Sequence, residues 1–223
     1  MAVSATNPGT PARTQAERSA ATRQALLDAT LECLVEDGYA NTTTARVAER
    51  AGVSRGAHLH HFQTRDALLA AAAEHLTLRR GEKLLAAADA LPAGEDRVAR
   101  GLDLLWGSYA NPLYQATLDL WTHGRTDPEL RDHLVPIERQ LDRQTMELSR
   151  HLFPDAAGRP DFERLVELAL ATIRGLVVLD TLHAGGTRAE KQWATCRGQL
   201  LALFEDAGAA AAPAPAAPPA PAA

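Results

Sequence analysis

The residues of this sequence best suited to chemistry lie close together, between Arg55 and His61. Arg55 can donate two parallel hydrogen bonds to a guanine edge or pair with a phosphate, and the neighbouring Gly56 lets the backbone approach closely. His58, His60 and His61 add imidazole groups, which can contact phosphates or hold a metal ion. The segment is therefore a candidate nucleic-acid interface or a candidate metal site.

The spacing of the histidines argues against the metal site. Two histidines on one helix bind a metal ion well when they are four positions apart, and no pair among these three has that spacing. Only His58 and His61 come within reach of each other. Cys33 and Cys196 follow no CxxC pattern, which predicts buried thiols in a reducing cytoplasm rather than a zinc site or a disulfide. We expect neither a metal nor a cofactor.

Two short helices joined by a tight turn must position these side chains. Thr43 or Thr44 can accept an orphan backbone N–H at the start of the first helix. Apolar residues from Val47 to Ala51 share one face of that helix, and Gly52 can adopt the positive φ at which a helix stops. Ser54 can then cap a second helix that extends to about position 61. This arrangement is typical of a helix-turn-helix.

The same residues resemble the DNA-binding region of the tetracycline-repressor (TetR) family of transcriptional regulators. Residues 47–56 (VAERAGVSRG) and 60–68 (HHFQTRDAL) follow the order, the spacing and the residue types of the family's motif. The resemblance covers about residues 22–69, and beyond it only the architecture carries over. It implies an all-α protein of about nine helices, with a three-helix DNA-binding head and a helical domain for ligand binding and dimerisation.

The sequence departs from the family at positions 57–59, where Ala-His-Leu replaces the usual Thr-Leu-Tyr. In the family the leucine packs inside the head and the tyrosine contacts DNA, so the family's base contacts cannot be copied here. We predict that His58 is buried against the first helix and neutral, because a charged imidazole there has no obvious partner. Leu59 then faces DNA, where it either touches a thymine methyl group or simply packs.

The candidate DNA contacts combine base-reading and phosphate-binding side chains. Arg55 is the predicted base reader, and His60 and His61 occupy positions that usually meet the phosphate backbone in the resembled family. The full set of candidates is Arg23, Thr43, Thr44, Arg46, Ser54, Arg55, Gly56, Ala57, Leu59, His60, His61 and Arg65.

The rest of the sequence predicts helices only. Apolar residues recur at helical spacing, prolines stand at positions suited to first turns, and no alternating β-branched segment occurs. Besides the helix-turn-helix, the predicted helices span residues 17–37, 64–91, 96–110, 112–124, 128–153, 160–184 and 187–207, with a kink or a split at Pro136. The chain divides into an arm (1–14), a helix-turn-helix domain (15–63), a ligand-binding and dimerisation domain (64–207) and an Ala/Pro-rich tail (208–223). We expect the arm and the tail to be disordered.

The charge distribution is compatible with local DNA binding. The 223-residue chain has a net charge of −5, but residues 1–62 hold six arginines and six acidic residues and are neutral. Such a head predicts modest non-specific affinity for DNA. Because no segment resembles a secretory signal or approaches the ~20 apolar residues of a membrane helix, we expect a soluble cytoplasmic protein with no membrane partner.

Aromatic and imidazole side chains in the second domain are, as a set, the best candidates for a ligand pocket, although for each single residue an ordinary helical core is the commoner role. The candidate ligand-binding residues are Trp106, Tyr109, Trp121, His123, Phe153 and His183. The strongly apolar segment 175–182 and the last helix, with Trp193, Leu200 and Phe204, can bury a two-helix face against a second copy of the chain. In the resembled family the last two helices form such a dimer bundle, and internal core is the competing interpretation.

These features together predict a ligand-responsive transcriptional repressor that is a homodimer through its last two long helices. We expect it to bind a palindromic double-stranded DNA operator and to be released from that operator by a small-molecule effector. The alternatives are a metal-assisted enzyme that uses the histidines and a helical small-molecule carrier. No nucleophile–base pair, phosphate-binding glycine loop or HExxH run supports an enzyme, so we do not expect enzymatic activity.

Overall fold

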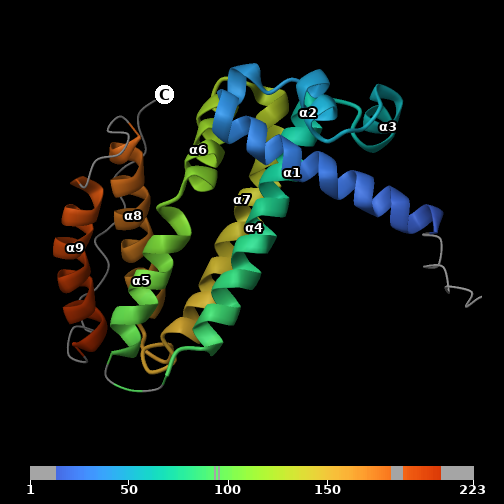
Figure 1. Ribbon diagram of the computed structural model, residues 1–223. Helices are drawn as coiled ribbons and strands as arrows, with labels where there is room; N and C mark the ends of the chain where they lie inside the picture. The colour runs from blue at the N-terminus through green and yellow to red at the C-terminus, as the bar shows by residue number, and fades with distance from the viewer. Residues whose placement is uncertain (1–13, 93, 95, 182–187, 207–223) are drawn as a thin grey trace, which may run out of the picture.

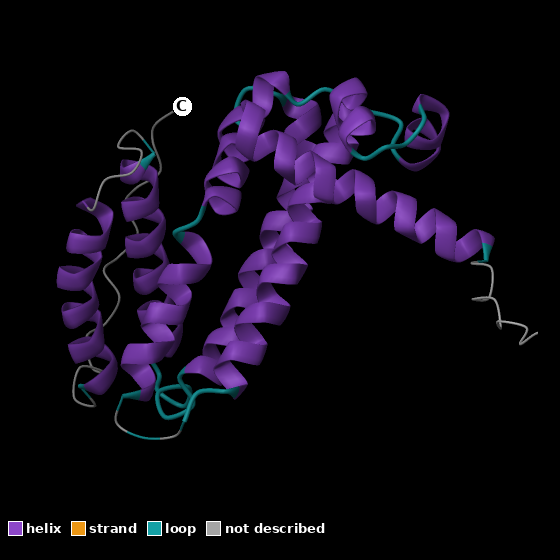
Figure 2. Cartoon of the chain, in the orientation of Figure 1, coloured by secondary structure: helices purple, strands orange, loops and turns teal. Residues whose placement is uncertain are grey.

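The computed structural model describes residues 14–92, 94, 96–181 and 188–206. Within these ranges the chain forms nine α-helices and no strand, which confirms the predicted all-α fold (Figure 2). The helices are α1 (Gln15–Asn41), α2 (Thr44–Arg50), α3 (Arg55–His61), α4 (Arg65–Asp89), α5 (Arg97–Tyr109), α6 (Pro112–Gly124), α7 (Pro128–Leu152), α8 (Phe162–Asp180) and α9 (Arg188–Glu205). Except for Thr14, the predicted arm lies outside the described residues, as does the predicted tail.

Side-chain caps set the starts of six of these helices. Each cap oxygen accepts the backbone N–H three residues further on, which satisfies one of the donors that a helix start leaves unpaired. The caps are Thr14, Thr43, Ser54, Thr64, Asn111 and Asp127. Thr43 rather than Thr44 caps the first helix of the helix-turn-helix. Local sequence therefore determines where these helices begin.

Two predicted interruptions of helices differ in the structure. The first helix is predicted to end at residue 37, just before Gly38. In the structure the φ of +75° at Gly38 only kinks α1, because the backbone N–H and the hydroxyl of Thr42 both donate to the Gly38 carbonyl and hold one more turn. Pro136 does not split α7, which continues as one helix of 25 residues. Pro136 is exposed, and α7 packs along α4, which compensates for the lost backbone hydrogen bond.

The helices α4 and α7 lie side by side and form the long central pair of the molecule (Figure 1). Helix α1 crosses the top of this pair, and its first half projects beyond it. Helices α2 and α3 pack beside α1 and α4 at that end, whereas α8 and α9 pair with each other on the opposite side, next to α5. We call α1–α3 the head and α4–α9 the body.

Three clusters of buried apolar residues hold these parts together. One lies inside the head and includes Leu26, Val47 and Phe62. A second fills the body around α5, α8 and α9. The third joins Leu34 of α1 and Leu69 of α4 to residues of α6 and α7, so the head packs directly on the body. Among the described residues, no helix combines the length and apolar character needed to cross a membrane.

Candidate DNA interface and ligand pocket

Helices α2 and α3 form a helix-turn-helix whose turn is fixed by backbone hydrogen bonds. The Val53 N–H donates to the Ala48 carbonyl at 3.0 Å, and Gly52 has a φ of +67°, a conformation that suits glycine. The Ser54 hydroxyl accepts the Ala57 N–H at 3.2 Å and starts α3. Because Val47 of α2 is buried in the head cluster, this turn presents α3 at the surface.

The outer face of α3 carries the predicted base reader. Arg55, Gly56 and His60 are exposed, and Ala57 and His61 are partly buried. No side chain in the described part of the chain forms an ion pair with the guanidinium of Arg55, which remains available to a nucleic acid. Within the described residues, the start of α3 therefore offers an unpaired cation beside a glycine, and the base-reading role of Arg55 stays a prediction.

His58 and Leu59 lie where the sequence predicted. His58 is 2% exposed, whereas Leu59 is 50% exposed, so the imidazole packs inside the head and the leucine faces outward. Burial lowers the pKa of His58, and the nearby His61 lowers it further, which favours the neutral form. The histidine thus substitutes for the leucine that the resembled family places at this position.

Two other arginines of the head are paired with acidic residues of α1. Arg46 lies 2.6 Å from Asp37, and Arg50 lies 2.5 Å from Glu36. Of these two, Arg46 is a predicted DNA contact and is half-exposed, so it would have to exchange a carboxylate for a phosphate. Arg23, another candidate, lies over the ring of Phe62 with its guanidinium carbon 5.5 Å from the ring centre. The ion pairs of Arg46 and Arg50 make the α2 side of the head less positive than its arginine content suggests.

Arg65, also a predicted DNA contact, is bound to the head itself. Its Nε donates to the Thr42 carbonyl at 2.8 Å, and a second guanidinium nitrogen donates to the Tyr39 carbonyl. The same guanidinium lies 4.2 Å above the Tyr39 ring, and the imidazole of His123 stacks on Tyr39 with ring centres 3.9 Å apart. The side chain of Tyr39 thus connects the start of α4 with the end of α6. Sequence reasoning gave Tyr39 no role, since three segments distant in the chain form this contact.

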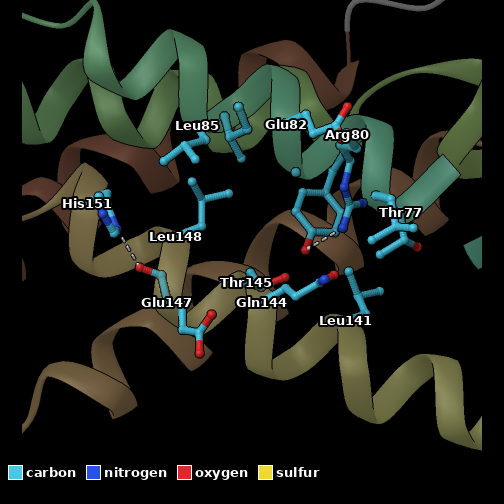
Figure 3. Close-up of a pocket in the computed structure, with 14 residues that line it drawn as sticks. Thr77, Arg80, Glu82, Leu85, Leu141, Gln144, Thr145, Glu147, Leu148 and His151 are labelled. Atoms are coloured by element: carbon cyan, nitrogen blue, oxygen red, sulfur yellow. Dashed lines mark hydrogen bonds between the residues drawn. The ribbon is translucent and has the colours of Figure 1, made fainter. Parts of the chain in front are cut away.

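The body contains a cavity of about 270 Å³ between α4 and α7 (Figure 3). Its lining includes Arg80 and Leu85 of α4, Tyr109 of α5, and Gln144 and Leu148 of α7. A larger cleft of about 670 Å³ lies on the other side of α4, between the body and α1. Arg80 and Leu84 line both and separate them.

Of the predicted ligand-binding residues, Tyr109 lines the α4–α7 cavity. The others pack elsewhere: Trp106 stacks on Trp193 with ring centres 5.1 Å apart, Phe153 is buried against Phe204, and His123 contacts Tyr39. Trp121 contacts Tyr114, and His183 lies outside the described residues. The aromatic set therefore divides among core, head contact and cavity, and the ligand-binding role of its members stays a prediction.

Two functional candidates that sequence reasoning missed are Arg80 and Arg174, which flank Tyr109. The guanidinium of Arg174 lies within 5.6 Å of the centre of the Tyr109 ring. Arg174 is the one charged residue between Leu168 and Leu179 of α8, and a single charge in such an apolar run signals a partly buried, paired group. Arg80 had no comparable signal, because α4 is mixed in composition.

The rings of His60 and His61 lie with their centres 5.4 Å apart, but the three histidines of α3 do not form one metal-binding group. His58 is buried while His60 is exposed, and among the described residues no group of three His, Cys, Asp or Glu side chains is placed to hold a metal ion. What the site offers instead is an exposed helix for a DNA groove and a cavity in a separate helical body. This arrangement defines a helix-turn-helix transcriptional regulator with a ligand-binding domain.

Comparison with known proteins identifies the family. Residues 26–72 match the family described as bacterial regulatory proteins, tetR family, and residues 107–205 match the BetI-type transcriptional repressor C-terminal domain. The regulator CymR of Pseudomonas putida is 33% identical over 175 residues, which cover 74% of this chain and 82% of that protein. The chain therefore belongs to the TetR family, and it is a ligand-responsive transcriptional repressor of the BetI type rather than an enzyme.

Solved structures share the fold at lower sequence identity. A TetR transcription regulator from Haloarcula marismortui superposes with a TM-score of 0.64 at 22% identity, over 84% of this chain and 98% of that one. A regulator from Saccharomonospora viridis in complex with choline superposes with a TM-score of 0.62 at 18% identity, over 84% and 97% of the two chains.

Proposed function

We propose that the protein represses transcription as a homodimer, with one α3 helix from each subunit in successive major grooves of a palindromic operator. The observation that carries this proposal is the exposed, unpaired guanidinium of Arg55 at the start of α3. Arginine donates to the N7 and O6 atoms of guanine in the major groove. One helix of seven residues reads few bases, so two heads at a spacing of roughly 34–36 Å are needed for specificity. Such a repressor acts in the cytoplasm.

The dimer interface that we propose is the outer face of α8 and α9. Leu168, Val178 and Leu179 of α8 are 46%, 50% and 56% exposed, and Leu203 of α9 is 37% exposed. The residues that alternate with them, Leu176, Val177, Trp193 and Phe204, are buried inside the subunit. The buried residues support the internal-core interpretation for the inward face, and we propose the dimer interpretation for the outward face. The outward face supports self-association, because an exposed apolar surface is stabilised by burial against a second copy.

The effector site that we propose is the cavity between α4 and α7. Helix α4 begins in contact with the head, at Arg65, and carries Arg80 in the cavity wall. Helix α6 contacts the head independently, through His123 on Tyr39. A ligand that shifts α4 relative to α6 changes the position of the head, and the spacing of the two heads decides DNA affinity. By linkage, operator DNA then weakens effector binding by the same factor.

Gel-shift titration of the purified protein with the DNA flanking its gene tests the repressor function, and sedimentation at micromolar concentration tests the dimer. Leu179→Asp places a charge in the proposed interface and should yield monomers with operator affinity reduced at least about tenfold. Val135→Asp, at a 38% exposed position of α7, is the matched control and should remain dimeric. A monomeric parent protein that binds no DNA would refute the proposal.

A further inference from the structure

The wall of the α4–α7 cavity contains an arginine without an acidic partner. The guanidinium of Arg80 lies 4.3 Å from the centre of the Tyr109 ring and 5.6 Å from that of Tyr114, and its NH2 donates to the Tyr109 hydroxyl at 3.5 Å. No carboxylate in the described part of the chain forms an ion pair with Arg80, although its side chain is partly buried. A partly buried cation without a counter-ion is destabilised by the loss of hydration.

A second cation adds to the positive charge behind Tyr109. Arg174 of α8 lies 5.6 Å from the centre of the Tyr109 ring, and its one ion pair within the described residues, with the exposed Asp142, is 3.5 Å long. Burial opposes the charge of Arg174, but the Tyr109 and Tyr114 hydroxyls and Asp142 outweigh it and raise its pKa above the ordinary value. The guanidinium therefore stays charged, and its Nε is buried with no hydrogen-bond partner in the part of the chain that the structure describes.

The remaining polar groups beside these arginines can also donate. Tyr114, which lines the neighbouring cleft, is 2% exposed, and its hydroxyl has no hydrogen-bond partner among the described residues. Burial raises its pKa to about 12 and keeps the proton on the oxygen. Thr145 and Gln144 bring a hydroxyl and an amide to the cavity. The donors that line the cavity are the Arg80 guanidinium, the Thr145 hydroxyl and the Gln144 amide, and together they are complementary to a group that only accepts hydrogen bonds and carries negative charge. Arg174, behind Tyr109, adds positive charge from outside the lining.

The cavity lining differs between its two ends. Arg80, Gln144 and Thr145 lie toward one end together with Leu141, whereas Leu85 and Leu148 lie toward the other end, on the side of His151 and Glu147 (Figure 3). Its volume of about 270 Å³ equals the space of about nine waters at roughly 30 Å³ each. A ligand of this size with one acceptor group and an apolar remainder fits both ends.

We propose that the effector is a small carboxylate with an apolar body, whose carboxylate pairs with Arg80 and whose body packs against Leu85 and Leu148. This inference rests on the proposed effector site and specifies its ligand class. A small organic cation such as choline, the ligand of one similarly folded protein, does not fit the same groups. A cation site needs an open aromatic face or a buried carboxylate. Here Arg80 covers Tyr109, and the two acids in the lining, Glu82 and Glu147, are exposed.

Calorimetric titration of the full-length protein with three probes tests the assignment. The probes are 3-phenylpropanoate, its uncharged amide and choline. We expect the carboxylate to bind about ten- to a hundredfold more tightly than the amide, as charge-assisted hydrogen bonds to a guanidinium imply, and choline not to bind. In Arg80→Gln the carboxylate should lose this advantage, and Arg80→Lys should retain part of it. Arg143→Gln, which removes an exposed charge from α7 outside the cavity lining, is the control and should bind like the parent.

Equal binding of the carboxylate and the amide, binding of choline alone, or no binding of the carboxylate would each overturn the proposal. So would an unchanged carboxylate preference in Arg80→Gln. Operator binding without ligand, measured by gel shift, is a separate readout. A protein that binds carboxylates through Arg80 but never binds DNA would refute the repressor function and leave the ligand assignment intact.

Discussion

Replacing Arg65 by alanine separates a role in holding the head from a role in contacting DNA. The parent guanidinium donates to the carbonyls of Thr42 and Tyr39 and lies 4.2 Å above the Tyr39 ring. Hydrogen bonds that involve a charged group contribute about 1.5–3 kcal/mol each, and a cation–π contact about 0.5–2 kcal/mol. Arg65 is only partly buried and truncation lets water reach both carbonyls, so we expect a loss of about 2–4 kcal/mol in the free energy of unfolding.

The assay combines urea denaturation with operator binding at several salt concentrations. If Arg65 holds the head, the stability falls as stated, while the slope of log affinity against log salt stays as in the parent, because no phosphate contact is lost. Arg65→Lys should recover only part of the stability, since an ammonium group cannot reproduce the two directed hydrogen bonds and the planar stacking. Arg55→Ala, at an exposed position, is the control and should change stability by less than about 0.5 kcal/mol.

The opposite result would refute this reasoning. An Arg65→Ala variant with parental stability and a salt slope reduced by about one unit would identify Arg65 as a phosphate contact. The hydrogen bonds to Thr42 and Tyr39 would then not contribute to the stability of the head.

Three further predictions follow from particular residues of the head and the body. Arg55→Ala should cost about 1–3 kcal/mol of operator binding and relax specificity at one base pair in a gel-shift series of operator variants; an equal loss on every sequence would make Arg55 a phosphate contact. Burial lowers the pKa of His58 in the folded protein, so the unfolded chain binds more protons than the folded one. The free energy of unfolding should therefore fall as the pH decreases from about 7.5 through the unfolded pKa of about 6.5. His58→Leu should reduce this loss in urea denaturation at about pH 7.5 and 5.5, and an unchanged loss would show that His58 titrates alike in both states. Gly101→Ala places a methyl group 2.6 Å from Phe153 and should destabilise the body by about 1–3 kcal/mol in thermal unfolding. Gly107→Ala, with open space around it, should be neutral or stabilising. Equal melting temperatures for the two variants would mean that Phe153 moves aside without cost.

The positions of the helices were predictable because their signals are local. A cap such as Ser54 or Thr64 acts on a backbone N–H three residues away, and the apolar spacing of α4 or α8 repeats within a few turns. The orientation of His58 and Leu59 was predictable from the resemblance, because the family places a packed leucine at the position of His58 and a DNA-contacting residue at the position of Leu59. The motif around Gly52 and Ser54 then identified the class of protein, since its turn needs those residue types at that spacing.

The effector cavity and the connection between head and body were decided only by the tertiary structure. Apolar periodicity shows that Trp106, Tyr109 and Phe153 face inward, but it cannot distinguish a core position from a cavity wall. The distinction depends on how α4, α5, α7 and α8 pack, which brings Arg80 and Arg174 to the same tyrosine although 94 positions separate them in the chain. The motif likewise predicted that Arg65 contacts DNA. Only the tertiary structure showed that its guanidinium donates to the backbone carbonyls of Tyr39 and Thr42.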